Sequence, residues 1–186
     1  MKQSITYFII LLSLTSYSQR NCNLQLSKNI DIYAVDVTEM KCIAQNSDKK
    51  NTLFFTFGIW CEPCRLHLPN AIKFAAENNV DFYVILVEAE TDGLAKQAID
   101  YLKKIKSDIN ILILKDEIYG LKRSKKNKKF VTEITPKELE NIADYSKYIL
   151  INNTGKVLMV TNWKDNQEND WTDDTKMVKK RIAPLL

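Results

Sequence analysis

Three strongly hydrophobic runs lie in the first two thirds of the chain, at residues 51–60, 80–90 and 109–116. Each is rich in β-branched and aromatic residues and too continuously apolar for an edge strand, which predicts three buried strands. Residues 62–77 and 91–106, between these runs, have helical patterns. The order strand, helix, strand, helix, strand predicts an α/β fold whose first strands are parallel.

The pattern changes near the end of the chain. The segment "YSKYILINNTGKVLMVTNW" places two strands around "NNTG", where Asn and Gly tolerate positive φ, and this predicts an antiparallel hairpin. The following "DWTDDTKMVKKRIAPLL" predicts a terminal helix with Thr172 as N-cap and the cations from Lys179 to Arg181 near its last turn. Together the elements predict a mixed central sheet with flanking helices and a C-terminal hairpin plus helix.

Residues 115–145 have the weakest pattern. A short helix is predicted at "TPKELENIADY", where Thr135 would cap and Pro136 would open the first turn. The preceding "KRSKKNKKF", from Lys122 to Phe130, carries six cations and one aromatic residue. We interpret it as a solvated loop in preference to an anion-binding or membrane-surface patch.

The N-terminus has the pattern of a signal peptide. Lys2 precedes an apolar run from Ile5 to Leu14, and the small residues Ser16 and Ser18 follow at the spacing that a signal peptidase recognises. A ten-residue run is short of the roughly 20 residues that span a bilayer, so no stable membrane insertion is expected after cleavage. The prediction is a signal peptide at residues 1–18 and a single exported domain at residues 19–186, periplasmic or extracellular.

Length and charge restrict the remaining classes. With 186 residues and 45% hydrophobic residues, the chain can build one ordinary core. The formal net charge is +4, and +3 once Lys2 is removed with the signal peptide, which is too small and dispersed to predict nucleic-acid binding.

Four cysteines matter more in an exported protein, because thiols usually pair in an oxidising compartment. A bridge between Cys22 and Cys42 would close a twenty-residue loop and stabilise the fold by roughly 3 kcal/mol. Free, unpaired cysteines are the alternative at these two positions.

Cys61 and Cys64 lie where the first strand gives way to a helix. The unpaired backbone N–H groups of a helix N-terminus favour an anion, which lowers the pKa of a thiol there below its ordinary value of about 8.5. Cys64, three residues on, is within bonding reach and can resolve a mixed disulfide. Pro63 suits the first helical turn, whereas the charge of Glu62 repels a thiolate, so we expect a reducing Cys61 rather than a strongly oxidising one.

Other interpretations of this pair are weaker. A structural zinc site is disfavoured because His67 is the only histidine and no second two-cysteine knuckle exists, so neither a metal nor another bound cofactor is expected. A purely structural disulfide would restrain the unfolded chain little across so short a ring. His67, one turn after Cys64, either relays a proton or only covers its helix.

The motif "WCEPC" runs from Trp60 to Cys64, and Pro69 follows five residues after the second cysteine. These residues resemble the thioredoxin superfamily, and most of all its exported TlpA-like branch: the motif matches the tryptophan and two-cysteine signature, and Pro69 stands where the family's first helix characteristically kinks. The resemblance implies a protein thiol-disulfide oxidoreductase in which Cys61 attacks, Cys64 resolves and Trp60 shields them. Its partners would be protein disulfides or dithiols and an upstream thiol donor.

Three positions depart from that pattern. Ser146 occupies the place of the family's cis-proline, so a trans peptide bond is expected there. Phe55 replaces the buried carboxylate that accepts the resolving thiol's proton, leaving water, His67 or another carboxylate such as Glu88 for that role. His67 itself replaces a glutamate. Because of Ser146 and Phe55, a thioredoxin-fold binding or adaptor module with a sensing or vestigial disulfide is the alternative function.

Overall fold

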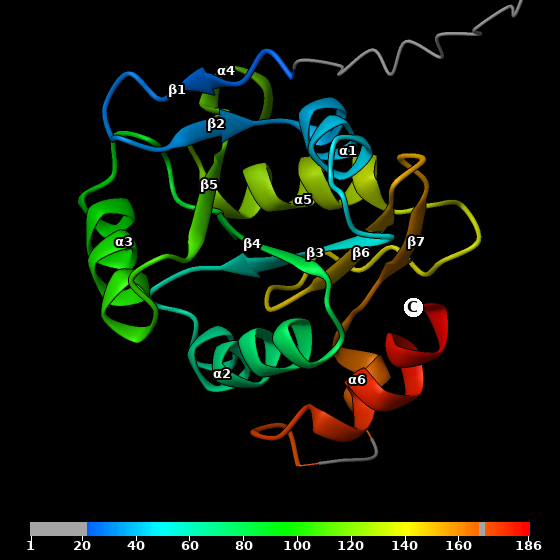
Figure 1. The fold of residues 1–186 in the computed structure, drawn as a ribbon. Coiled ribbons are helices and arrows are strands. Elements are labelled where there is room, and N and C mark those ends of the chain that lie inside the picture. Colours follow the sequence, from blue (N-terminus) through cyan, green and yellow to red (C-terminus); the bar gives the residue numbers. More distant parts are fainter. Residues whose placement is uncertain (1–21, 168–169) are drawn as a thin grey trace, which may run out of the picture.

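One mixed sheet organises the computed structural model, which describes residues 22–167 and 170–186 (Figure 1). The predicted signal peptide at residues 1–18 lies outside the described residues. Within them, seven strands follow the order β1-β2-β5-β4-β3-β6-β7. The strands are β1 Gln25–Leu26, β2 Tyr33–Val35, β3 Asn51–Phe57, β4 Asp81–Leu86, β5 Asn110–Leu114, β6 Tyr148–Asn152 and β7 Val157–Val160.

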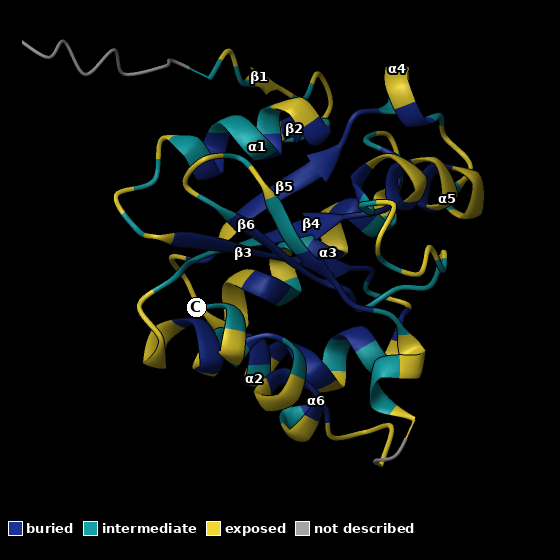
Figure 2. Ribbon diagram, turned by 90° about the vertical axis from the view of Figure 1, so that its right-hand side faces the viewer, coloured by how far each residue is buried: buried dark blue, intermediate teal, exposed yellow. Residues whose placement is uncertain are grey.

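Helices cover both faces of this sheet. Their bounds are α1 Val37–Gln45, α2 Glu62–Glu77, α3 Gly93–Ile105, α4 Asp116–Tyr119, α5 Arg123–Ile134 and α6 Thr175–Arg181, with 3₁₀ turns at Trp163–Asn166 and Ala183–Leu185. Helices α2, α3 and α6 pack on one face, and α1 and α5 pack on the other (Figure 1). The sheet is therefore buried between two helical layers, and Figure 2 shows its central strands almost wholly buried.

Strand β3 is the predicted central strand. All seven of its residues are buried, and it pairs in parallel with β4 and antiparallel with β6. Phe55 and Phe57 enter the core on the α2 side, while Phe54 enters the core on the α5 side. Because helices cover both faces of the sheet, the side chains on both faces of this strand are buried, and apolar residues follow one another along it without alternating with polar ones. The parallel pairing of β3, β4 and β5 and the α/β fold are confirmed.

The C-terminal hairpin is also confirmed, whereas the cap of the last helix differs from the prediction. Strands β6 and β7 pair antiparallel. Gly155 in the turn between them has φ of +80°, a conformation that residues with a side chain rarely adopt. Helix α6 begins at Thr175, preceded by Asp174. Thr172 is not the N-cap, because its backbone N–H is held by Asp170 Oδ1 at 2.9 Å in a turn before the helix.

The region after β5 contradicts two predictions. The cationic stretch is not a loop but most of α5, whose inner side buries Phe130, Val131 and Ile134. These apolar residues recur at helical spacing, and their anchoring outweighs the mutual repulsion of the lysines. No helix forms at residues 135–145: Thr135 is extended at the C-terminal end of α5, because the following Pro136 disfavours the helical conformation of its predecessor.

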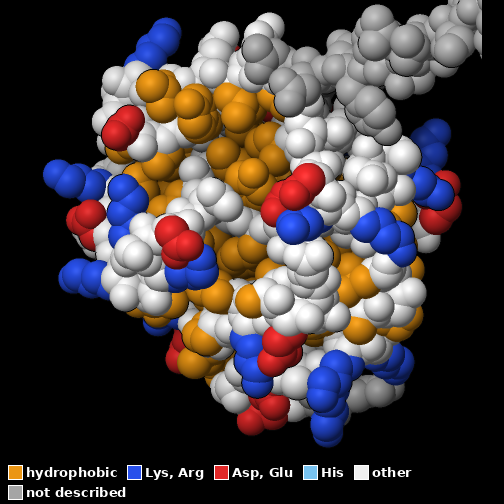
Figure 3. All heavy atoms as spheres, viewed as in Figure 1, with side chains coloured by type: hydrophobic (Ala, Val, Ile, Leu, Met, Phe, Trp, Pro, Cys, Tyr) orange, Lys and Arg blue, Asp and Glu red, His pale blue; other side chains and the backbone are white. Residues whose placement is uncertain are grey.

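Two surface features complete the fold. In the view of Figure 3, hydrophobic side chains gather around β1 and β2, where Leu26 and Tyr33 are exposed, and cationic side chains gather along the α3 edge.

A disulfide between Cys22 and Cys42 ties the segment before β1 to α1. No helix in the described residues is both long and apolar enough to cross a bilayer.

Candidate functional site

The two cysteines of "WCEPC" lie where β3 leads into α2. Cys61 is the N-cap of α2 and Cys64 lies in its first turn, and a disulfide joins them. The Cys64 backbone N–H donates to Cys61 Sγ at 3.2 Å. This is the hydrogen bond of an N-cap with sulfur in place of the usual oxygen, and the same N–H is placed to stabilise a thiolate after reduction. The joint predicted from the sequence is therefore present.

The two sulfur-bearing residues differ in accessibility. Cys61 is 6% exposed, whereas Cys64 is fully buried. Pro63 lacks an N–H and fits the first turn of α2 between them, and Glu62 is exposed beside it. An external reagent therefore reaches Cys61 first.

Trp60 lies beside the disulfide in an aromatic and cationic setting. Its ring meets Tyr145 edge to face at 4.7 Å between centroids, and the Arg123 guanidinium lies 4.7 Å from its centroid. A Cβ on Gly58 would lie 2.8 Å from the Trp60 ring, so a side chain at residue 58 would displace that ring. Trp60 is thus held between the first residue of α5 and the loop before β6.

The loop before Cys61 is fixed from both sides. Glu88, after the end of β4, accepts the Ile59 backbone N–H at 3.0 Å, and Arg65 donates to the Ile59 carbonyl at 2.5 Å. Glu88 is fully buried, and burial raises the pKa of its carboxyl, although hydrogen bonds to backbone N–H groups and the charge of Arg123 oppose the increase. Its Oε2 has no hydrogen-bond partner within the described structure.

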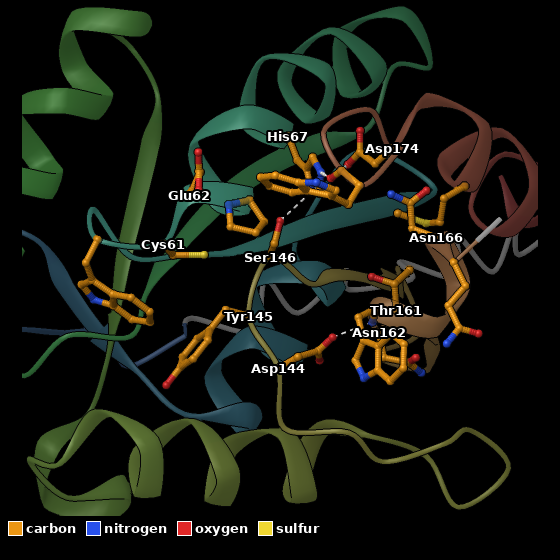
Figure 4. Close-up of a pocket in the computed structure, with 16 residues that line it drawn as sticks. Cys61, Glu62, His67, Asp144, Tyr145, Ser146, Thr161, Asn162, Asn166 and Asp174 are labelled. Atoms are coloured by element: carbon orange, nitrogen blue, oxygen red, sulfur yellow. Dashed lines mark hydrogen bonds and ion pairs between the residues drawn. The ribbon is translucent and has the colours of Figure 1, made fainter. Parts of the chain in front are cut away.

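Ser146 faces the disulfide region from the loop before β6 (Figure 4). Every peptide bond in the described residues is trans, as expected for the Tyr145–Ser146 bond, and Ser146 has φ of +61°. This left-handed conformation is unfavourable for a serine and is held in place by neighbouring contacts. The adjacent Lys147 backbone exchanges hydrogen bonds with Thr56 of β3, through its N–H at 2.9 Å and its carbonyl at 3.0 Å.

His67 connects three segments of the site. Its Nδ1 lies 2.9 Å from Ser146 Oγ, and its Nε2 lies 2.8 Å from the Trp171 carbonyl. Because a carbonyl only accepts, Nε2 donates, and in the neutral ring Nδ1 accepts the Ser146 hydroxyl. Both ring nitrogens of His67 therefore contact the loop and the C-terminal segment rather than Cys64.

A buried carboxylate lies behind His67. Asp174 accepts hydrogen bonds from Tyr148 and from Asn70, both at 2.6 Å, and lies 3.6 Å from His67 Nδ1. Burial and the neighbouring carboxylate raise the pKa of Tyr148 well above its ordinary value. Asp174 thereby joins α2, β6 and the start of α6 instead of capping its own helix.

An open cavity of about 710 Å³ borders Cys61 (Figure 4). Its walls come from the start of α2, the loop before β6 and the segment after β7. Side chains that line it include Trp60, Tyr145, Trp163, Trp171 and Met177. A cavity of this size with aromatic walls suits an apolar side chain or a short peptide segment next to the disulfide.

Of the residues named from the sequence, Trp60, Cys61, Glu62, Pro63, His67 and Ser146 all line this cavity. Sequence reasoning missed Trp163, Trp171 and Asp174, which complete the wall. Two tryptophans in an otherwise polar segment were the only available signal. No group of three or more His, Cys, Asp or Glu side chains suited to a metal ion occurs among the described residues.

Two similar solved structures are a thiol:disulfide interchange protein of the thioredoxin family from Chlorobium tepidum TLS and BsSco, a member of the Sco family of cytochrome c oxidase assembly proteins. The first has 18% identity, covers 71% of this chain and 79% of its own, and gives a TM-score of 0.42. The second has 17% identity, covers 85% and 89%, and gives 0.43.

No curated protein matches the sequence. The Redoxin family matches residues 33–178, which include every strand from β2 to β7 and the two bonded cysteines of α2. The chain therefore belongs to the Redoxin family, and its α/β fold is thioredoxin-like.

Proposed function

We propose that this protein is an exported thiol-disulfide oxidoreductase that reduces disulfides in other proteins. Residues 1–18 would be removed as a signal peptide, and residues 19–186 would form the single working domain, periplasmic or extracellular. The observation that carries the proposal is the disulfide at the N-terminus of α2, with Cys61 as the more accessible partner at the edge of an apolar cavity. Membership of the Redoxin family supports it.

The reaction begins with the reduced protein. The Cys61 thiolate attacks one sulfur of the substrate disulfide, forms a mixed disulfide and releases the other substrate sulfur as a thiolate, which takes up a proton. The Cys64 thiolate then attacks Cys61 Sγ and releases the second substrate sulfur as a thiolate, which also takes up a proton. Two electrons pass to the substrate, Cys61 and Cys64 become the observed disulfide, and an upstream dithiol donor restores them.

The local charges set the direction of exchange. The helix N-terminus and the Cys64 N–H favour a thiolate at Cys61, whereas the adjacent Glu62 disfavours it. These two effects on the Cys61 thiolate oppose one another, so the reduced dithiol is not strongly stabilised relative to the disulfide. A dithiol that is not strongly stabilised gives up its electrons readily, which suits a reductant.

Cys64 is buried, so its thiol must lose a proton without direct contact with bulk water. His67 is engaged at both ring nitrogens. Glu88 has a buried oxygen without a hydrogen-bond partner and a raised pKa, and it contacts the loop that leads into Cys61. Glu88 is therefore the carboxylate that we assign to proton uptake in this site.

A second function is supported by one observation. Ser146, in the place of the family's cis-proline, is tied by His67 to the C-terminal segment that lines the cavity. That arrangement also suits a binding or adaptor module in which the disulfide only senses redox state. The two functions differ in whether Cys61 turns over.

The test is reduction of a protein disulfide by the pre-reduced chain and its variants. We expect Cys61→Ser to abolish turnover and Cys64→Ser to accumulate a mixed disulfide with the substrate, which a nonreducing gel detects and dithiothreitol releases. Turnover that persists in Cys61→Ser, or no covalent complex on Cys64→Ser, would favour the adaptor. Mixed disulfides captured in the exporting cell would then identify the substrates.

A further inference from the structure

Helix α5 has an inner side that supports the redox site. Asn127, fully buried, donates to the Ala143 and Asp144 carbonyls at 3.3 and 3.0 Å, and so holds the loop that carries Ser146. In Figure 4 this helix runs below that loop. At the start of the helix, Arg123 lies over Trp60. The position of α5 is therefore fixed relative to the disulfide.

The opposite side of α5 is a row of exposed lysines. Its members, which we call the lysine face, are Lys122, Lys125, Lys128 and Lys129. None of them forms an ion pair in the described parts of the chain. The six cations between residues 122 and 129 exceed the whole chain's net charge of +4, so the rest of the sequence is net negative by two. Helix α5 with its N-cap residue therefore carries a local excess of positive charge beside the site.

This placement opposes the stability of the helix itself. The first turn of α5 contains no acidic residue, and the N-cap Lys122 makes no side-chain cap hydrogen bond. Cations are disfavoured at a helix N-terminus, and lysines three and four positions apart repel one another. Phe130, Val131 and Ile134 hold the helix to the core despite this repulsion, so the cations lower its stability without unfolding it, and local conflicts of this kind are common at functional sites. An anionic partner would offset the repulsion.

Apolar surface accompanies the lysine face. Leu121, immediately before it, is 63% exposed, and Ile118 of α4 is 41% exposed. A mixed apolar and cationic surface favours a protein partner over bulk solvent. Arg123, the residue after Lys122, contacts the ring of Trp60, which precedes Cys61, so this surface adjoins the disulfide.

We propose that the lysine face, with Leu121, docks an acidic segment of the protein substrate and so delivers the substrate disulfide to Cys61. This inference rests on the proposed oxidoreductase function and adds the chemical class of its substrate. Electrostatic attraction over a helix fixed to the site raises the rate of productive encounter rather than the rate of the exchange step.

Two peptides test the proposal. Each carries the same internal disulfide, one flanked by aspartates and glutamates and the other by lysines. At low salt we expect the pre-reduced protein to reduce the acidic peptide roughly tenfold faster, and expect the difference to shrink as salt screens the charges. The triple variant Lys125→Glu, Lys128→Glu, Lys129→Glu should lose or reverse the preference.

A matched control changes the same charge elsewhere. Lys96, Lys103 and Lys104 of α3 are exposed and lie on the opposite face of the sheet, so their replacement by glutamate should keep the preference for the acidic peptide. Urea unfolding verifies that both triple variants fold, and the α5 variant should stay folded because Lys125→Glu places an acid in the first turn of the helix and the three exposed side chains make no ion pair with the described residues that is lost.

Three outcomes overturn the inference: equal rates for both peptides, an α5 variant that keeps the preference, and an α3 control that loses it. Binding of the protein to anionic phosphatidylglycerol vesicles through the lysine face, with no peptide preference, also overturns it in favour of a membrane surface. If neither peptide is reduced by the parent protein, the proposed function itself fails, which distinguishes the two results.

Discussion

At the scale of single residues, opposing charges surround Cys61. The Cys64 N–H and the start of α2 stabilise negative charge on its sulfur, while Glu62 stands next to it as a like charge. Glu88 is buried and accepts the backbone N–H of Ile59 in the loop before Cys61. The side chains of Glu62 and Glu88 can each be replaced without altering the cysteines, so their two contributions are separately measurable.

Replacing Glu62 by Gln tests the like-charge effect. We expect the pKa of the Cys61 thiol to fall, because the neighbouring negative charge is removed. A larger fraction of thiolate at pH 7 raises the alkylation rate, but a weaker base is also a weaker nucleophile, so the net increase should be only roughly twofold. Thiolate absorbance against pH and iodoacetamide kinetics measure the two quantities. A pKa that rises on substitution would contradict this account of Glu62.

Glu88 gives a pH dependence of stability. Burial raises the pKa of the Glu88 carboxyl in the folded protein above its ordinary value of 4.5. The contribution of the protonated carboxyl to the free energy of unfolding is therefore complete below pH 4.5 and is lost as the pH rises through the pKa of the folded state. Glu88→Gln keeps the acceptor for Ile59 and removes the buried charge, so it should increase the free energy of unfolding at pH 7, with a gain that disappears near pH 4.5. Urea unfolding across this range checks it, and a gain independent of pH would contradict the mechanism.

At the scale of elements, helix α5 was the hardest to predict. The many lysine and arginine residues of this segment indicated a solvated loop, whereas Phe130, Val131 and Ile134 anchor it to the core as a helix. Lys126 is also fully buried, donating to the Glu88 and Leu114 carbonyls and to Asp116 at 2.6 to 2.8 Å. A buried lysine is rare and depends on partners far along the chain, so a local pattern does not reveal it.

Lys126 therefore has a measurable structural role. Lys126→Met should lower the free energy of unfolding by about 3 kcal/mol or more, because Asp116 and two carbonyls lose their shared cation in a buried site. Lys125→Met, at the exposed neighbouring position, should change it by less than about 0.5 kcal/mol. Equal effects of the two substitutions in urea unfolding would show that the buried contacts do not contribute as described.

The Cys22–Cys42 disulfide acts on the N-terminal elements. It joins the segment before β1 to α1 across a separation of 20 residues. Replacing both cysteines by serine should lower the free energy of unfolding by roughly 3 kcal/mol through greater freedom of the unfolded chain. The exchange rate of Cys61 should be unchanged, and a loss of exchange in a folded double variant would assign these cysteines to the redox chemistry.

At the scale of the whole molecule, the site is assembled from distant parts of the chain. The strand-to-helix joint at Cys61 was predictable because a continuous apolar run meets a helical pattern there, and the hairpin was predictable from "NNTG". The cavity wall was not, because Trp163 and Trp171 occur in a polar segment whose place depends on the Asp174 network with α2 and β6. Long-range hydrogen bonds of this kind have no local sequence pattern.

The central claim is that this assembly makes Cys61, the more accessible of the two cysteines, a nucleophile with a stabilised thiolate. Alkylation of the reduced protein by iodoacetamide over a range of pH, with the modified cysteine identified by mass spectrometry, tests it directly. We predict that Cys61 reacts before Cys64 and that its rate titrates with a midpoint below about 8.5, the value of a free thiol. Modification of Cys64 first, or a midpoint at or above that value, would contradict the account.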